Sequence, residues 1–219
     1  MVGTIHDAAG LRFLKTSKAR AGLLGRSVDL LEIRLDALNG AKLPKSWQLP
    51  VIATARHPGE GGSNSLSTVT RRSLLEGALP WVSAIDVELQ SVRPMRSVIA
   101  SAHQRGRTVI LSHHDFAATP TVAALKGLAA RAADAGADLF KVATLIREPR
   151  DLQRLIEFQS GARNLPVTAM GMGPAGRFSR IVLCGFGAPL CYGWLGNPQV
   201  SGQWPALELR GLLSGILPT

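Results

Sequence analysis

The stretch TVILSHHDFAATPTVAALKGLAARAADAGADLFKVAT, residues 108–144, decides how the chain folds. It opens and closes with short apolar runs, 108–115 and 137–144, that have the length and β-branched content of strands. The residues between them have the periodicity of a helix. A strand, a helix and a strand in this order predict a parallel pair joined by a right-handed crossover.

The helical part, 119–136, carries its own start and stop signals. Thr119 is the predicted N-cap, Pro120 takes the first helical position and Gly136 is the C-terminal cap. The same kind of pattern predicts three further helices, at 95–106, 148–161 and 206–217.

Apolar strand-like runs recur along the whole chain, with helices mostly between them. The eight runs are 1–5, 28–36, 50–55, 84–90, 108–115, 137–144, 166–172 and 188–195. This alternation predicts a (β/α)8 TIM barrel, somewhat short, and an open doubly wound sheet is the alternative. No G-x-G-x-x-G follows the first run, which disfavours a dinucleotide fold. No proline- or serine-rich linker interrupts the chain, so residues 1–219 are expected to form one catalytic domain.

The amino-acid composition indicates the size of the core and the compartment of the protein. The 219 residues are 46% hydrophobic and 18% charged, enough for a sizeable core. Cys184 and Cys191 form no disulfide framework and no metal-ligand spacing, so a reducing cytoplasm is expected. The first residues lack the pattern of a signal peptide, and no run approaches the roughly 18 apolar residues of a membrane span.

The chain is basic, with 25 Lys and Arg against 15 Asp and Glu, a net charge of +10. The basic residues are scattered and aromatic residues make up only 5% of the chain. Nucleic acid is therefore not expected as a partner, and a small anionic ligand fits the charge at least as well.

Polar and titratable residues gather at the carboxyl ends of the predicted strands, where active sites of parallel barrels form. They are Glu32, Arg34, Arg56, His57, Glu60, Asp86, Glu88, Ser112, His113, His114, Asp115, Lys141, Arg177 and Arg180. Taken singly, each has an ordinary structural explanation, such as a snorkelling lysine or a satisfied histidine. A purely structural barrel gives no reason to collect them at one end.

The alternation of side chains along a strand predicts which face several of these residues occupy. Lys141 shares a face with Leu139 and Ala143, and a partly desolvated amine inside a barrel can act as a nucleophile. Glu32 and Arg34 share one face of their strand, where they could pair or bind a ligand together. Asp86 and Glu88 are expected to be hydrogen-bond partners inside the barrel.

Seven segments in order resemble the type I 3-dehydroquinate dehydratases, the Schiff-base enzymes of the shikimate pathway. They are EIRLD (32–36), TARHPGEGG (54–62), IDVEL (85–89), SHHDFAATP (112–120), ADLFKVAT (137–144), MGMGPAGRFSRI (170–181) and SGQW (201–204). Each segment is weak evidence, but together they cover nearly the whole chain.

The resemblance implies a dehydration of 3-dehydroquinate to 3-dehydroshikimate without metal or organic cofactor. It implies that Lys141 forms an imine with the substrate, that His114 shuttles protons and that Glu60 accompanies this histidine. The residues implied to bind the substrate are Glu32, Arg34, Arg56, Arg180, which would hold the carboxylate, and Gln203 of the closing loop.

Several points stay open. The closing loop reads QVSGQ (199–203) where the family has S-A-P-G-Q, so Gln199 replaces the serine and Ser201 the proline. Either Gly3 or Thr4 stands where the first strand should reach the site. Other functions compatible with the residues are a class I aldolase, another lysine-imine barrel, and a basic binding barrel without catalysis. A homodimer is also left open.

Overall fold

The computed structural model describes residues 1–16, 21–44 and 46–216. All eight predicted strands are present: β1 (Val2–Ile5), β2 (Leu30–Arg34), β3 (Val51–Thr54), β4 (Ala84–Glu88), β5 (Thr108–Asp115), β6 (Leu139–Leu145), β7 (Val167–Met172) and β8 (Tyr192–Trp194).

Helices connect the strands. They are α1 (Ala8–Thr16), α2 (Ala21–Ser27), α3 (Thr68–Ala78), α4 (Val92–Gln104), α5 (Val122–Asp134), α6 (Pro149–Ser160), α7 (Gly176–Gly185) and α8 (Ala206–Ile216). Two short 3-10 helices, η1 (Pro58–Glu60) and η2 (Leu89–Ser91), follow β3 and β4. The last residue of the helix predicted at 206–217 lies outside the described residues.

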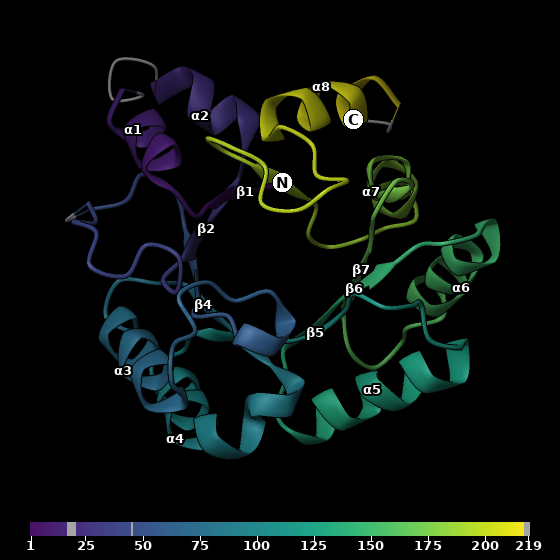
Figure 1. The fold of residues 1–219 in the computed structure, drawn as a ribbon, viewed down its shortest axis with the longest axis horizontal. Coiled ribbons are helices and arrows are strands. Elements are labelled where there is room, and N and C mark those ends of the chain that lie inside the picture. The colour runs from purple at the N-terminus through teal and green to yellow at the C-terminus, as the bar shows by residue number, and fades with distance from the viewer. Residues whose placement is uncertain (17–20, 45, 217–219) are drawn as a thin grey trace.

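The strands form a ring and the helices surround it (Figure 1). Every recorded strand pair is parallel, and the order is β7-β6-β5-β4-β3-β2-β1-β8. The order follows the sequence, and β8 pairs with β1, which confirms the barrel-type fold and excludes the doubly wound alternative. Within the described residues, no backbone ladder joins β7 to β8.

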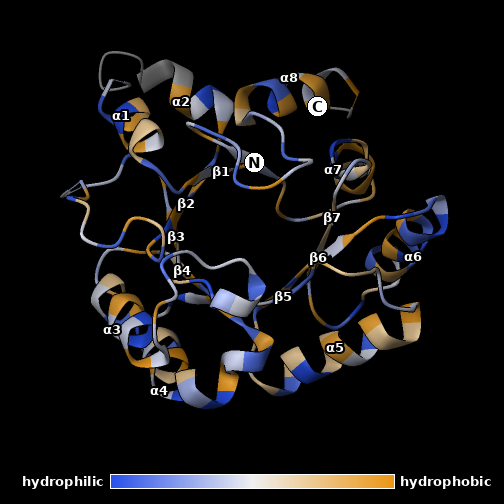
Figure 2. Ribbon diagram, viewed as in Figure 1, coloured by the Kyte–Doolittle hydropathy of each residue, from blue (hydrophilic) through white to orange (hydrophobic). Residues whose placement is uncertain are grey.

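The sheet separates two apolar regions. The larger cluster lies between the outer face of the strands and the helices and includes Ile33, Ile85 and Phe140. The smaller one lies inside the ring and includes Ile52 and Leu139. Figure 2 shows the helices banded with hydrophobic and hydrophilic residues, as expected for helices with one face on the sheet and one in water.

Helix α5 begins two residues later than predicted. Thr121, not Thr119, is the N-cap, and its side chain accepts a hydrogen bond from the Ala124 amide. Thr119 is occupied elsewhere, since its hydroxyl lies 2.8 Å from the Thr144 hydroxyl and donates to the Leu145 carbonyl. A residue held by the neighbouring strand is not free to cap its own helix.

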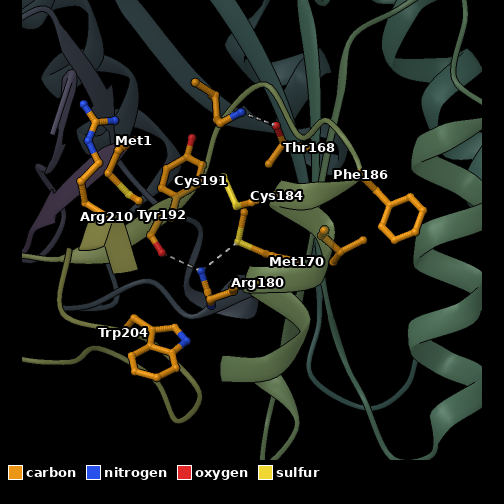
Figure 3. The surroundings of a disulfide bond; sticks show 12 residues. Met1, Thr168, Met170, Arg180, Cys184, Phe186, Cys191, Tyr192, Trp204 and Arg210 are labelled. Atoms are coloured by element: carbon orange, nitrogen blue, oxygen red, sulfur yellow. Dashed lines mark hydrogen bonds between the residues drawn. A yellow bond between two sulfur atoms is a disulfide. The ribbon is translucent and has the colours of Figure 1, made fainter. Parts of the chain in front are cut away.

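Cys184 and Cys191 form a disulfide, so the sequence-based expectation of no disulfide was wrong. The bond joins the end of α7 to the residue before β8, beside Arg180 and Tyr192 (Figure 3). The turn after α7 brings the two Cα atoms to 6.2 Å, within the normal range for a disulfide. Location in a reducing cytoplasm stays a prediction, and the disulfide removes one of the grounds for it.

No helix in the described part of the chain is long and apolar enough to cross a membrane.

Candidate active site

A cavity of about 70 Å³ opens at the carboxyl ends of the strands. All eight site residues expected from the sequence line it: Glu32, Arg34, Arg56, Glu60, His114, Lys141, Arg180 and Gln203. They come from β2, β5, β6, α7 and the segments that follow β3 and β8. Residues spread over most of the sequence therefore meet in one place.

Lys141 points into the barrel, where its side chain is almost fully buried. Its Nζ donates to Asp86 Oδ2 at 2.7 Å and lies 3.4 Å from Glu32 Oε1. The ring of Tyr192 covers the ammonium at 4.4 Å from the ring centre. The lysine is thus held in a fixed direction by two carboxylates and an aromatic face.

Glu32 is fixed from both neighbouring strands. The hydroxyls of Thr4 and Thr54 each donate to it at 2.8 Å. Burial raises the pKa of Glu32, but the charges of Lys141, Arg34 and Arg56 together outweigh it, so the net pKa is below the usual value. Thr4 lines the cavity, which settles which residue of β1 reaches the site, because Gly3 is packed against Leu195 on the other face.

Arg34 does not pair with Glu32, one of the two roles considered for it. It forms a two-point ion pair with Asp36, at 2.9 and 2.8 Å, and donates to the Gly61 carbonyl at 3.1 Å. Asp36 lies two residues beyond Arg34, just after β2, and the bidentate geometry favours this partner.

Asp86 and Glu88 are fully buried and accept hydrogen bonds from other side chains inside the barrel, as expected. Arg56 contacts Asp86 at 3.0 Å and Glu88 at 3.1 Å. The Ser112 hydroxyl donates to Asp86 at 2.6 Å, and Arg71 from α3 pairs with the second oxygen of Glu88. This network holds Asp86 beside Lys141, a contact that the sequence did not predict.

Glu60 and His114 form a pair. The ring Nδ1 of His114 lies 2.9 Å from Glu60 Oε2, and the His114 backbone amide donates to the same oxygen at 2.9 Å. The turn that carries Glu60 needs glycine, because Gly61 has a φ of 81° and a Cβ on Gly62 would lie 2.2 Å from the Arg56 carbonyl. His113 is not among the residues that line the cavity.

The surroundings shift the protonation of this pair. Burial raises the pKa of Glu60 to about 7, although Arg56 and Gln90 act in the opposite direction. Burial, with the charges of Arg56 and Lys141, holds the pKa of His114 well below its usual value. A neutral imidazole facing the cavity can accept a proton near neutral pH.

Arg180 differs from the other buried cations. Its guanidinium donates to the Tyr192 carbonyl at 3.1 Å and lies 3.6 Å from the Met170 sulfur (Figure 3). It also donates to the Gly202 carbonyl at 3.1 Å. Within residues 1–16, 21–44 and 46–216 it has no carboxylate partner. Burial lowers its pKa to about 10, which still leaves it charged at neutral pH.

The loop after β8 covers the cavity with Gln199, Val200 and Gln203. The side-chain carbonyl of Gln203 accepts from the Gln199 amide at 2.7 Å and the Val200 amide at 3.4 Å. The side-chain oxygen of Gln203 therefore stabilises the fold of its own loop, a role that the sequence did not predict.

Sequence reasoning missed the apolar wall of the cavity, formed by Phe116, Ala143, Met170, Met172 and Tyr192. The inward alternation along β6 and β7 was the available signal, but apolar residues facing inward are equally typical of an ordinary barrel core.

Comparisons with known proteins show which family the chain belongs to. The sequence model of the family described as Type I 3-dehydroquinase matches residues 14–216. A 3-dehydroquinate dehydratase of Latilactobacillus sakei is 35% identical over 205 residues, covering 86% of this chain and 83% of the relative. One of Methanothermobacter thermautotrophicus is 32% identical over 217 residues, covering 94% and 95%.

Solved structures share the fold. The 3-dehydroquinate dehydratase of Geobacillus kaustophilus superposes with a TM-score of 0.81 at 22% identity, covering 98% of this chain and 90% of that one. That of Aquifex aeolicus gives 0.80 at 22% identity, covering 100% and 99%. Since the family match spans nearly the whole chain and the relatives align over most of their own length, the chain belongs to the type I 3-dehydroquinase family of carbon–oxygen lyases.

Proposed function

We propose that this chain dehydrates 3-dehydroquinate to 3-dehydroshikimate through an imine on Lys141, with His114 as the proton shuttle. The observation that carries the proposal is that Lys141, the Glu60–His114 pair and the unpaired cation Arg180 line one cavity. That cavity supplies an amine, a base and an anion-binding group for a β-hydroxy ketone that bears a carboxylate.

The first step needs Lys141 as a free amine. Its ammonium gives up a proton to solvent, because Asp86, the carboxylate at 2.7 Å, stays ionised: burial raises the pKa of Asp86, but the charges of Arg56 and Lys141 lower it more. The amine adds to the ketone carbon, the proton given up earlier returns to the departing hydroxyl, and loss of one water leaves a protonated imine. A protonated imine withdraws electrons more strongly than the ketone does, so it acidifies the proton on the adjacent carbon.

His114 then takes that proton on its free ring nitrogen, and the electron pair moves towards the imine. The β-hydroxyl leaves as water with the proton that His114 returns, and a second water hydrolyses the imine. Glu60 orients the imidazole through Nδ1, as a third group commonly orients a catalytic base. Arg180 holds the carboxylate.

Family membership favours this reaction over carbon–carbon cleavage by a class I aldolase and over a binding barrel without catalysis. We also infer that residues 1–219 act as one catalytic domain, because residues from most of the chain line a single cavity. A homodimer stays a prediction.

The test is an absorbance assay for enone formation from 3-dehydroquinate, followed by borohydride trapping. Borohydride with substrate should add a stable mass to the peptide that contains Lys141, and Lys141→Ala should abolish both turnover and trapping while the fold remains. Lys126→Ala, an exposed lysine of α5, is the matched control. Absence of enone formation would refute the reaction, and an adduct on another lysine would refute the assignment of Lys141.

A further inference from the structure

Gln90 lies outside the cavity lining, yet it contacts the catalytic pair. It belongs to η2, the short helix directly after β4, and its side-chain amide donates to Glu60 Oε1 at 2.7 Å. Glu60 lies in η1, the equivalent short helix after β3. The two 3-10 helices thus meet over the end of β5, where His114 lies.

The hydrogen bonds divide between the two oxygens of Glu60. Oε2 faces the backbone amide and the ring Nδ1 of His114, both at 2.9 Å, and Oε1 accepts from Gln90. As placed, the Gln90 NH2 group and the His114 backbone amide both act as donors. An ionised carboxylate, which only accepts, satisfies all of these contacts together.

The charge of Glu60 also determines which ring nitrogen of His114 carries the proton. An ionised Glu60 accepts from Nδ1–H, which leaves the lone pair on Nε2, towards the cavity. A protonated Glu60 would donate to Nδ1, and the neutral ring would then carry its proton on Nε2. In that form His114 cannot take a proton from the substrate.

We propose that Gln90 is a positioning residue that keeps Glu60 ionised and thereby holds His114 in the tautomer that acts as a base. This inference rests on the proposed function for its catalytic meaning, although the Gln90–Glu60 contact can be tested without it.

Other charges act on the same pair. Arg56, just after β3, favours the ionised form of Glu60, and Glu88 from β4 opposes it. His114 faces Lys141, Asp86 and Arg34 in addition to Arg56. With the pKa of Glu60 raised to about 7, its ionised and protonated forms are about equally populated at neutral pH. The loss of one hydrogen-bond donor therefore changes the ionised fraction measurably.

The experiment compares pH profiles of kcat/KM. Gln90→Ala should move the acid limb towards higher pH by about one unit, because the ionised form loses a hydrogen bond. At pH 7 this is a loss of roughly fivefold, because the ionised fraction of Glu60 falls from about one half to about one eleventh, and the loss recovers as the pH rises towards about 9. Gln90→Glu should shift the limb further in the same direction, because a second carboxylate opposes ionisation of Glu60.

Two further variants complete the set. Gln90→Lys restores a donor and adds a positive charge, so its acid limb should return to or pass below the wild-type position. Gln104→Ala, an exposed glutamine at the end of α4, should leave the profile unchanged. A loss of kcat/KM in Gln90→Ala that is equal at every pH would mean a purely structural role and would overturn the proposal.

The ¹³C titration of the Glu60 carboxyl, followed by NMR in wild type and Gln90→Ala, separates this inference from the proposed function. If wild type turns over 3-dehydroquinate but neither the acid limb nor the titration moves, the inference fails and the function stands. If wild type shows no turnover, the function fails. The inference then depends on the titration: a raised pKa in Gln90→Ala supports it, and an unchanged one overturns it.

Discussion

The two sides of the cavity differ in whether their buried cations have carboxylate partners among the described residues. On the side formed by β2 to β6, Arg34, Arg56 and Lys141 each lie within 3.1 Å of a carboxylate oxygen. On the side formed by β7 and β8, Arg180 contacts only backbone carbonyls and a sulfur among the described residues. The paired side also has a continuous backbone ladder, whereas β7 and β8 have none between them.

The difference separates two uses of a buried cation. A paired cation stabilises the geometry of its partners, because its removal leaves a carboxylate buried without compensation. A buried cation without a carboxylate partner destabilises the free protein, because its charge has lost water. A bound anion offsets this cost. The β7–β8 side is therefore the expected place for the substrate carboxylate, and the other side for the groups that carry out the reaction.

The largest effect is expected from His114 on the paired side. His114→Ala should lower kcat by roughly 10²- to 10⁴-fold, the usual contribution of general acid–base catalysis, while borohydride still traps an adduct on Lys141. His113→Ala is the matched control, since His113 precedes it on β5 but does not line the cavity. A larger loss of kcat in His113→Ala would mean that the two histidines are wrongly assigned.

The next prediction concerns stability. Arg56→Met should lower the free energy of unfolding by about 3–5 kcal/mol, because Asp86 and Glu88 lose a buried partner. Arg180→Met should leave it unchanged or raise it, because no carboxylate loses a partner. Urea unfolding of the two variants measures the contrast. Equal destabilisation of both would remove the distinction between the two sides.

Arg180 should instead matter for binding. Arg180→Ala should weaken substrate binding by about 2–5 kcal/mol, as for the loss of a buried hydrogen-bonded charge pair, and Arg180→Lys should restore only part of it. Steady-state kinetics measures both. If Arg180→Ala keeps the wild-type KM and kcat, the carboxylate binds elsewhere, and Arg34, Arg56 or Arg177 becomes the candidate.

The smallest effect is expected in the closing loop. Ser201→Pro should tighten substrate binding by about 0.4–1 kcal/mol, because proline restricts the free loop before it closes. The Ser201 amide donates no hydrogen bond in the described part of the chain, so proline removes no such contact. Ser201→Ala, which keeps the backbone free, should leave KM unchanged. Weaker binding in Ser201→Pro would mean that the loop needs a backbone angle that proline cannot adopt.

The sequence by itself determined the strands and the end of the barrel where the site lies. Each strand could be predicted because a short apolar run must be buried on both faces of a parallel sheet. Helix α6 could be predicted at 148–161 because Pro149 and Gly161 act locally, through their own backbone preferences. The cluster of polar residues followed from parallel strands alone, since their carboxyl ends meet at one edge.

The tertiary structure alone decided which of these residues contact one another. Arg34 forms its ion pair with Asp36 and not with Glu32. Thr119 is hydrogen-bonded to Thr144 and does not cap its helix, and Cys184 forms a disulfide with Cys191. That Arg180 has no carboxylate partner among the described residues likewise appears only once the ring is assembled. The Thr119–Thr144 contact and the surroundings of Arg180 depend on how separate elements pack against one another, whereas Arg34–Asp36 and Cys184–Cys191 depend on the course of the chain after β2 and after α7. Propensities and face alternation predict elements and faces, but not these distances of a few ångströms.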